Sequence, residues 1–196
     1  MDSTADSPRP ADLRSHDTLV MQQVTGFMSN DFDILDGAGE HAVGHVTTTG
    51  SGVARFFSGA RSLRVADADG TPLLRVEDPP GIGVDRFELS APDGTPVAEL
   101  RGRFSVFSTK VSMTLAVGAE PELHGDMLGL DYEFRYGEAV AARAAREWAG
   151  FSRGFLGHSR YVLAFDPTVP PPLRLAIVGG CIVLDLIRAK RSRSSG

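Results

Sequence analysis

The chain has 196 residues, of which 42% are hydrophobic and 23% are charged, and its formal net charge is -5 at pH 7. This length suits one domain with a sizeable core, and the negative charge argues against a general affinity for nucleic acid. The single cysteine, Cys181, excludes an internal disulfide and a thiolate metal site, so we expect a reducing, cytoplasmic compartment.

The N-terminal residues are polar and acidic, and they contain no apolar stretch of the kind found in a secretory signal. Their Ser, Pro and Asp content is typical of disorder. We therefore expect a disordered leader over residues 1–17, a single domain over residues 18–190, and a disordered basic tail over residues 191–196.

Four segments repeat one pattern, in which two short apolar runs flank a glycine-containing turn. Residues such as Asp and Gly accept the positive φ angle that tight hairpin turns require. Large apolar side chains also alternate along the flanking runs, as strands demand. The expected turns lie at Asp36–Gly39, at Asp67–Gly70, at Pro92–Gly94 and near Gly137. The last segment, which continues to Trp148, has some helical propensity, but its alternation favours a hairpin.

Roughly ten to twelve strands fit between Thr18 and Phe165, with the turns setting their lengths. An open sheet of that size tends to curl or close, because closure removes its exposed edges. We therefore expect a mainly β protein whose core is a closed antiparallel β-barrel.

The most apolar stretch, Leu173–Ile187, is followed at once by basic residues, which is the pattern of a membrane anchor. A spanning helix needs about 20 apolar residues, whereas this one would be roughly 22 Å long. Charged residues at Arg174 and Asp185 would each cost about 2.5 to 3.5 kcal/mol near the bilayer interior. The length and the charges favour a core helix over residues 173–187, enclosed by the strands.

Four residues of this helix, and one residue before it, have expected structural roles. Gly179 and Gly180 remove side chains at mid-length and would let a neighbouring backbone come close. Asp185 is either an ionisable group on a lipid path or, as we prefer, a carboxylate near the barrel mouth that binds loop amides or an Arg. Trp148 is expected to pack within the barrel, and Cys181 is expected to be an inert core thiol.

Several stretches together resemble a known family. REWAGFSRGFLGHSRYVLAF (residues 146–165), LAIVGGCIVLDLI (residues 175–187) and VMQQVTGF (residues 20–27) resemble the phospholipid scramblases in sequence and order. These proteins and the LURP-one-related proteins share the Tubby C-terminal-like fold, a barrel around a C-terminal hydrophobic helix. The resemblance covers roughly residues 19–188. It implies this fold and a non-enzymatic protein that handles or senses lipid.

The calcium site of scramblases is not matched. The corresponding positions, Leu156–Arg160, contain no carboxylate, and calcium needs several oxygen ligands. No cofactor is therefore expected. His41 and His45 lie on a predicted strand and are read as surface histidines, while Asp31, Asp33 and Asp36 lack the spacing of a calcium loop. We expect neither a metal site nor an enzyme active site.

The basic residues after the helix are the best candidates for a partner surface. Each basic residue near an anionic membrane contributes about 1 kcal/mol to the free energy of binding, so binding would be marginal and reversible. The candidates are Arg188, Lys190, Arg191 and Arg193. The partner would be an anionic phospholipid or phosphoinositide at the inner face of the plasma membrane. The alternatives are a solvated terminus on a soluble LURP-one-like interaction or scaffold module and, more weakly, genuine phospholipid scrambling.

Overall fold

Short strands joined by tight turns dominate the computed structural model, as the alternating apolar residues predict. It describes residues 12–24, 31–49, 61–79, 86–104, 109–116, 118, 122–125, 131–146 and 160–194. Within these ranges the elements are η1 (Leu13–Ser15), β1 (Thr18–Gln23), β2 (Phe32–Asp36), β3 (Ala42–Thr49), β4 (Arg61–Asp67), β5 (Pro72–Asp78), β6 (Arg86–Ser90), β7 (Pro96–Phe104), β8 (Thr109–Leu115), β9 (Glu122–Gly125), β10 (Asp131–Tyr136), β11 (Ala139–Arg146), β12 (Arg160–Phe165) and α2 (Pro171–Ser194).

All four predicted hairpins are present. They join β2 to β3, β4 to β5, β6 to β7, and β10 to β11. Gly39, Gly70, Gly94 and Gly137 have φ angles of 73°, 85°, 89° and 59°. A side chain is strained in this left-handed region, so glycine defines where each turn forms.

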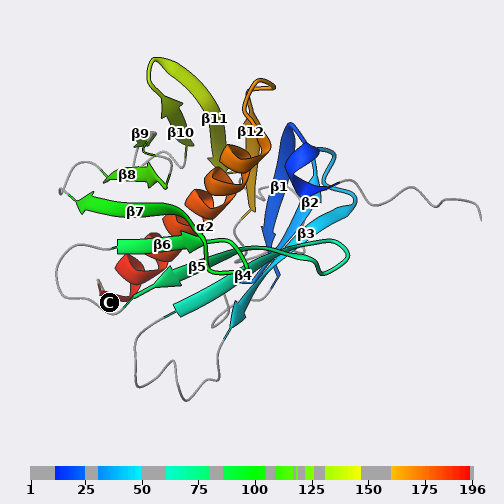
Figure 1. Ribbon diagram of the computed structural model, residues 1–196, viewed down its shortest axis with the longest axis horizontal. Helices are drawn as coiled ribbons and strands as arrows, with labels where there is room; N and C mark the ends of the chain where they lie inside the picture. Colours follow the sequence, from blue (N-terminus) through cyan, green and yellow to red (C-terminus); the bar gives the residue numbers. More distant parts are fainter. Residues whose placement is uncertain are drawn as a thin grey trace, which may run out of the picture.

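Every pairing in the sheet is antiparallel. Each strand pairs with the strand that follows it in sequence, and β12 pairs in addition with β1. The prediction of a mainly β fold, with one large antiparallel sheet and one C-terminal helix, is confirmed. Figure 1 shows α2 running between the two sides of this sheet.

The helix α2 fills the space inside the sheet. Every residue from Arg174 to Ile187 is buried. An added Cβ at Gly179 would meet Leu74 of β5, and one at Gly180 would meet Phe134 of β10, each at 2.8 Å. Strands on different sides therefore contact adjacent residues of the helix, which is why α2 is apolar around its whole circumference.

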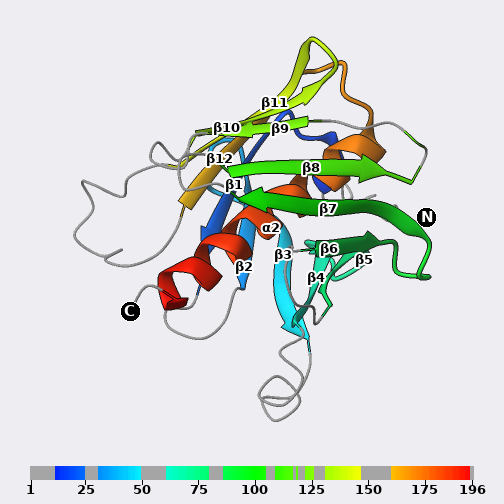
Figure 2. The same cartoon turned by 90° about the vertical axis from the view of Figure 1, so that its left-hand side faces the viewer.

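The helix is longer than predicted at both ends. It begins at Pro171 instead of 173 and continues to Ser194, seven residues beyond the predicted end. Residues 191–194, which we expected in a disordered tail, are helical, and the sequence from Arg188 to Ser194 contains no Gly or Pro that would end the helix earlier. In Figure 2 the red end of α2 extends beyond the strands.

The end of the predicted leader is ordered. Asp12 accepts a hydrogen bond from the backbone N–H of Arg14 and so caps η1. Leu13 is only 1% exposed, and its backbone N–H donates to Asp67 Oδ1 at 3.0 Å. The prediction of disorder through residue 17 is therefore wrong for residues 12–17, because one buried leucine within a polar segment is enough to hold it. Residues 1–11 lie outside the described part.

Candidate functional site

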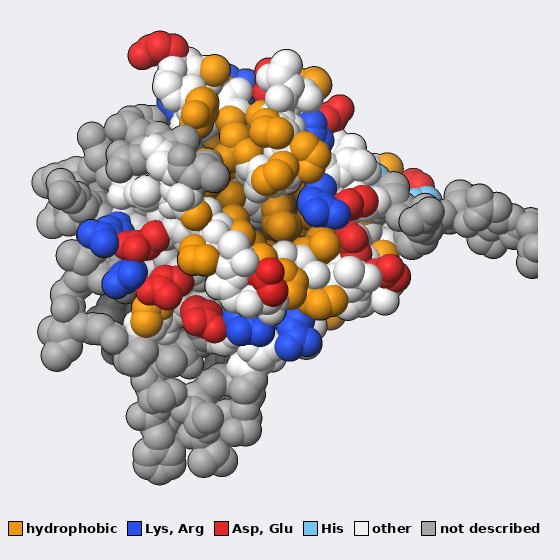
Figure 3. Space-filling view, in the orientation of Figure 1, with side chains coloured by type: hydrophobic (Ala, Val, Ile, Leu, Met, Phe, Trp, Pro, Cys, Tyr) orange, Lys and Arg blue, Asp and Glu red, His pale blue; other side chains and the backbone are white. Residues whose placement is uncertain are grey.

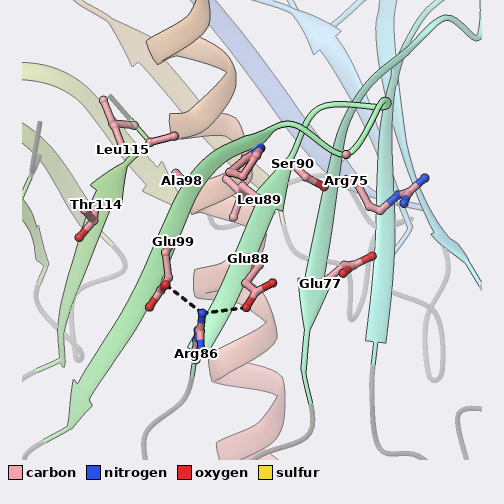
Figure 4. A pocket seen from close by; sticks show the side chains of 13 residues that line it. Arg75, Glu77, Arg86, Glu88, Leu89, Ser90, Ala98, Glu99, Thr114 and Leu115 are labelled. Atoms are coloured by element: carbon pink, nitrogen blue, oxygen red, sulfur yellow. Dashed lines mark hydrogen bonds and ion pairs between the residues drawn. The ribbon is translucent and has the colours of Figure 1, made fainter. Parts of the chain in front are cut away.

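A groove of about 520 Å³ lies on the outer face of the sheet, across β5, β6, β7 and β8. Charged side chains line its middle, and apolar side chains line the end near the β6–β7 turn (Figure 4). In Figure 3 acidic and basic side chains are interspersed over these strands. The charged members are Arg75, Glu77, Arg86, Glu88 and Glu99, and the apolar ones are Leu89, Pro96, Ala98, Leu115 and Ala116.

The strand register brings three carboxylates into one row. Glu77 of β5 is directly opposite Glu88 of β6, and Glu88 is directly opposite Glu99 of β7. Thr114 of β8 continues the row beside Glu99. Residues that alternate with these point inward to the core, such as Val76 at 0% exposure. The period of two therefore places all the groove carboxylates on the outer face.

Two carboxylates of this row, Glu88 and Glu99, form ion pairs with arginines. Arg86 Nη2 lies 3.0 Å from Glu88 Oε1 and 3.1 Å from Glu99 Oε2, and Arg101 also binds Glu99. The hydrogen bond from Arg101 lowers the pKa of the Glu99 carboxyl below its ordinary value. The Arg86 and Glu88 side chains are 51% and 46% exposed, so these pairs fix positions more than they stabilise the fold.

The third carboxylate of the row, Glu77, has no such arginine partner in the described part of the chain. Among the described residues, neither the Arg75 nor the Glu77 side chain forms a hydrogen bond or an ion pair. In Figure 4 the side chain of Glu77 lies away from Arg86, while Glu88 is linked to it. Glu77 and Glu88 thus form a like-charge cross-strand pair, an arrangement that disfavours the sheet locally.

The predicted structural residues lie inside the sheet. The close approach at Gly179 and Gly180 is made by side chains, not by a neighbouring backbone: Leu89 and Leu74 contact the first, Met113 and Phe134 the second. Burial raises the pKa of the Cys181 thiol. Trp148 lies outside the described residues.

Asp185 is buried at 8% exposure, and its Oδ1 accepts a hydrogen bond from the Tyr161 hydroxyl at 2.8 Å. The Tyr161 phenol of β12 is thus one partner of this carboxylate, and the expectation of an Arg or loop amides as partners stays a prediction. This hydrogen bond offsets part of the cost of burying a polar group on α2.

Arg174, which we read only as a flanking charge, is a buried clamp. Its guanidinium donates to the Val169 and His16 carbonyls at 2.8 Å each and to Asp17 Oδ1 at 2.6 Å. It also lies 5.4 Å from the centre of the Phe165 ring. These contacts join the start of α2 to the segment before β1.

The basic candidates have a described backbone only. Arg188, Lys190, Arg191 and Arg193 lie on the last turns of α2, and their side chains are outside the described part. The described ranges contain no helix with both the length and the apolar character needed to cross a membrane.

The two histidines of the predicted strand each lie beside a carboxylate. His41 Nδ1 lies 3.0 Å from Asp36 Oδ2, and His45 Nδ1 lies 3.0 Å from Asp33 Oδ1. No cluster of three His, Cys, Asp or Glu side chains suited to a metal is found among the residues that the structure describes. The backbone N–H of Glu40 and then His41 lower the pKa of Asp36 to about 2.

Sequence reasoning did not single out the groove. The Glu88–Glu99 pairing could have been found by folding the β6–β7 segment about its turn. The Glu77–Glu88 pairing has no such signal, because it depends on how β5 and β6 align across a longer connection.

The chain matches the family model described as LURP-one-related over residues 17–185. This confirms the predicted resemblance to LURP-one-related proteins, whereas the resemblance to scramblases stays a prediction. No curated protein and no solved structure matches the chain significantly.

Proposed function

The chain belongs to the LURP-one-related family, and on that basis we propose that it is a non-catalytic interaction module that binds a partner in the groove over β5–β8. The observation that carries this proposal is the groove itself. Its volume of about 520 Å³ is within the range of roughly 300 to 1,000 Å³ that ligand sites occupy.

The packing inside the sheet supports an external site. The helix α2 occupies the interior, and the closest contacts at Gly179 and Gly180 leave no room for even one more carbon atom. A partner is therefore better accommodated on the outer face, where the groove side chains are partly exposed.

The strand pairing favours recognition through side chains. Each of β5, β6, β7 and β8 pairs on both sides, so these strands offer no free edge for strand addition. The partner would instead be recognised by the charged and apolar side chains that line the groove.

A peptide-display selection tests this function. Random peptides displayed on phage would be selected against the purified chain, and each enriched peptide would be measured against two variants. Thr114→Trp fills the groove, and Ala164→Trp places the same side chain at an exposed position of β12. We expect binding to be lost in the first and kept in the second. No enrichment, or enrichment that Thr114→Trp leaves intact, would contradict the proposal.

Binding to an anionic membrane is the second candidate function. The observation that favours it is the continuation of α2 beyond Ile187, which carries Arg188, Lys190, Arg191 and Arg193 past the buried part of the helix (Figure 2). At about 1 kcal/mol for each basic residue, the interaction would be weak and sensitive to salt. The chain would then work in the cytoplasm and at the inner membrane face.

Vesicle co-sedimentation separates the two candidates. At low salt we expect the chain to bind phosphatidylserine vesicles but not phosphatidylcholine vesicles. Replacement of the four basic residues by Gln should remove this binding. Failure to bind at low salt would reject the lipid candidate and leave the groove proposal standing. Genuine scrambling is the weakest alternative, and lipid transfer between leaflets of reconstituted vesicles would support it.

A further inference from the structure

We infer that the groove recognises an extended peptide by holding one of its lysine or arginine side chains between Glu77 and Glu88. This inference rests on the proposed interaction function and adds the chemical class of the partner. It is carried by the charge distribution across the groove and by the distribution of its apolar residues.

The carboxylates of the row are unequally compensated. Glu99 binds both Arg86 and Arg101, and Glu88 binds Arg86 alone. Glu77 has no recorded partner in the described part of the chain. Glu77 is therefore the carboxylate of the row that remains open to a cationic group of a partner.

The register makes this side a two-carboxylate site. Residues directly opposite on antiparallel strands have Cβ atoms about 4.5 to 5.5 Å apart, so Glu77 and Glu88 can both reach a group placed between them. An ammonium or guanidinium group there would replace a like-charge contact with two attractive ones. Arg75 lies on the same face of β5, and in Figure 4 its guanidinium points away from Glu88.

The apolar end of the groove favours a peptide over a free cation. Pro96 and Ala116 are exposed near the β6–β7 turn, on the side of β7 and β8. Neighbouring strands are about 4.8 Å apart, so β8 and β5 are separated by roughly 14 Å. Four residues of an extended peptide cover that distance at about 3.3 Å each. One peptide can therefore place an apolar side chain at β8 and a cationic one at β5.

Nuclear magnetic resonance titration of the isotope-labelled chain tests the inference even if binding is weak. The probe is the blocked peptide Gly-Leu-Ser-Ser-Ser-Lys-Gly, in which Leu and Lys are four residues apart, and the matched probe carries norleucine in place of Lys. We expect the lysine peptide to shift amide signals of β5 and β6 and to lose affinity as salt increases. The norleucine peptide should bind at least fivefold more weakly. Equal binding of the two peptides would overturn the inference.

Variants of the chain test whether Glu77 is one of the carboxylates that bind the lysine side chain. Glu77→Gln should weaken the lysine peptide about fivefold without affecting the fold, since Glu77 is partly exposed and unpaired in the described structure. Glu133→Gln, on the outer face of β10, is the control and should leave binding unchanged. If Glu77→Gln binds as the natural chain does, the cation is held elsewhere and the inference is wrong.

Two further outcomes distinguish failure of the inference from failure of the proposed function. In the first outcome, spermidine binds as tightly as the lysine peptide, and replacing the Leu of the peptide by Gly does not change its affinity. The site would then bind a free polyamine, and the peptide inference would fail. If displayed peptides are lost in Thr114→Trp but tolerate Glu77→Gln, the groove binds a partner without a cation between these carboxylates, so only the inference fails.

Discussion

The two faces of β5, β6 and β7 are made by alternate residues of the same short segments, yet they differ in almost every property. The inner face packs against α2 through residues such as Leu74, Leu89 and Leu100, all at most 1% exposed. The outer face carries partly exposed charges in a groove. Stability therefore depends on the inner face, where packing is tight, while the outer face can change its chemistry at little cost to the fold.

The largest effect should follow from a substitution that adds volume at the inner face. Gly179→Val introduces a Cβ where Leu89 and Leu74 already contact the helix. We expect it to lower the free energy of unfolding by about 3 kcal/mol, because overpacking of a close-packed core is costly and Val adds two atoms beyond the Cβ. Urea denaturation followed by circular dichroism measures the change.

Two controls show whether the loss comes from overpacking. Ala145→Val adds atoms at an exposed position of β11 and should change stability by less than about 0.5 kcal/mol. Leu89→Ala creates space beside Gly179, so its effect combined with Gly179→Val should be smaller than the sum of the two single effects. Additive effects would show that the two residues do not compete for space.

The next largest loss of stability should follow from a substitution of Arg174, which joins the start of α2 to the segment before β1. Arg174→Met keeps most of the side-chain volume but leaves the carbonyls of His16 and Val169 without this donor. We expect a loss of about 2 to 3 kcal/mol. Hydrogen exchange should also become faster in residues 12–17, because the clamp holds them to the helix.

The matched control is Arg101→Met on the outer face, whose side chain is 63% exposed. It should change stability by less than about 1 kcal/mol. If the two arginine variants were equally destabilised, the contrast between the inner and outer faces would not hold for charged residues.

A smaller effect is expected at the buried phenol. Tyr161→Phe removes the hydroxyl that donates to Asp185 Oδ1 and should cost about 1 to 2 kcal/mol. Tyr136→Phe, at a tyrosine that is 48% exposed, should have almost no effect. Thermal unfolding of the pair gives the comparison directly, and equal midpoints would mean that the hydrogen bond contributes nothing net.

The sequence predicts the inner face well because apolar alternation and turn glycines are local signals. Gly39, Gly70, Gly94 and Gly137 each mark a hairpin that is present, and the uncharged run after Arg174 predicts a core helix. The helix is placed inside the sheet by a simple requirement: a helix that is apolar all round must be covered.

The outer face and the chain ends were harder to predict, since they depend on distant contacts. The groove requires β5 and β6 to align so that Glu77 faces Glu88, and no turn residue fixes that alignment. The order of residues 12–17 depends on Leu13, Asp67 and Arg174, which lie far apart in sequence. A single buried leucine in a polar segment gives no periodic pattern.

The smallest effect should be a pH dependence at an outer turn. In the β2–β3 turn, the backbone N–H of Glu40 and the side chain of His41 lower the pKa of Asp36 from 3.8 to about 2. A pKa that is lower in the folded chain than in the unfolded chain means that the ionised group stabilises the fold above pH 4. This contribution is lost as the pH falls from about 4 to about 2.

The variant Asp36→Asn keeps an acceptor oxygen for the Glu40 N–H but has no charge to lose. Between pH 4 and pH 2 its unfolding midpoint in urea should therefore fall less steeply than that of the natural chain, and the two curves should converge near pH 2, where Asp36 itself becomes uncharged. Parallel curves over this range would show that Asp36 does not couple to folding, and that the ordered turn is held by its backbone and by Gly39 alone.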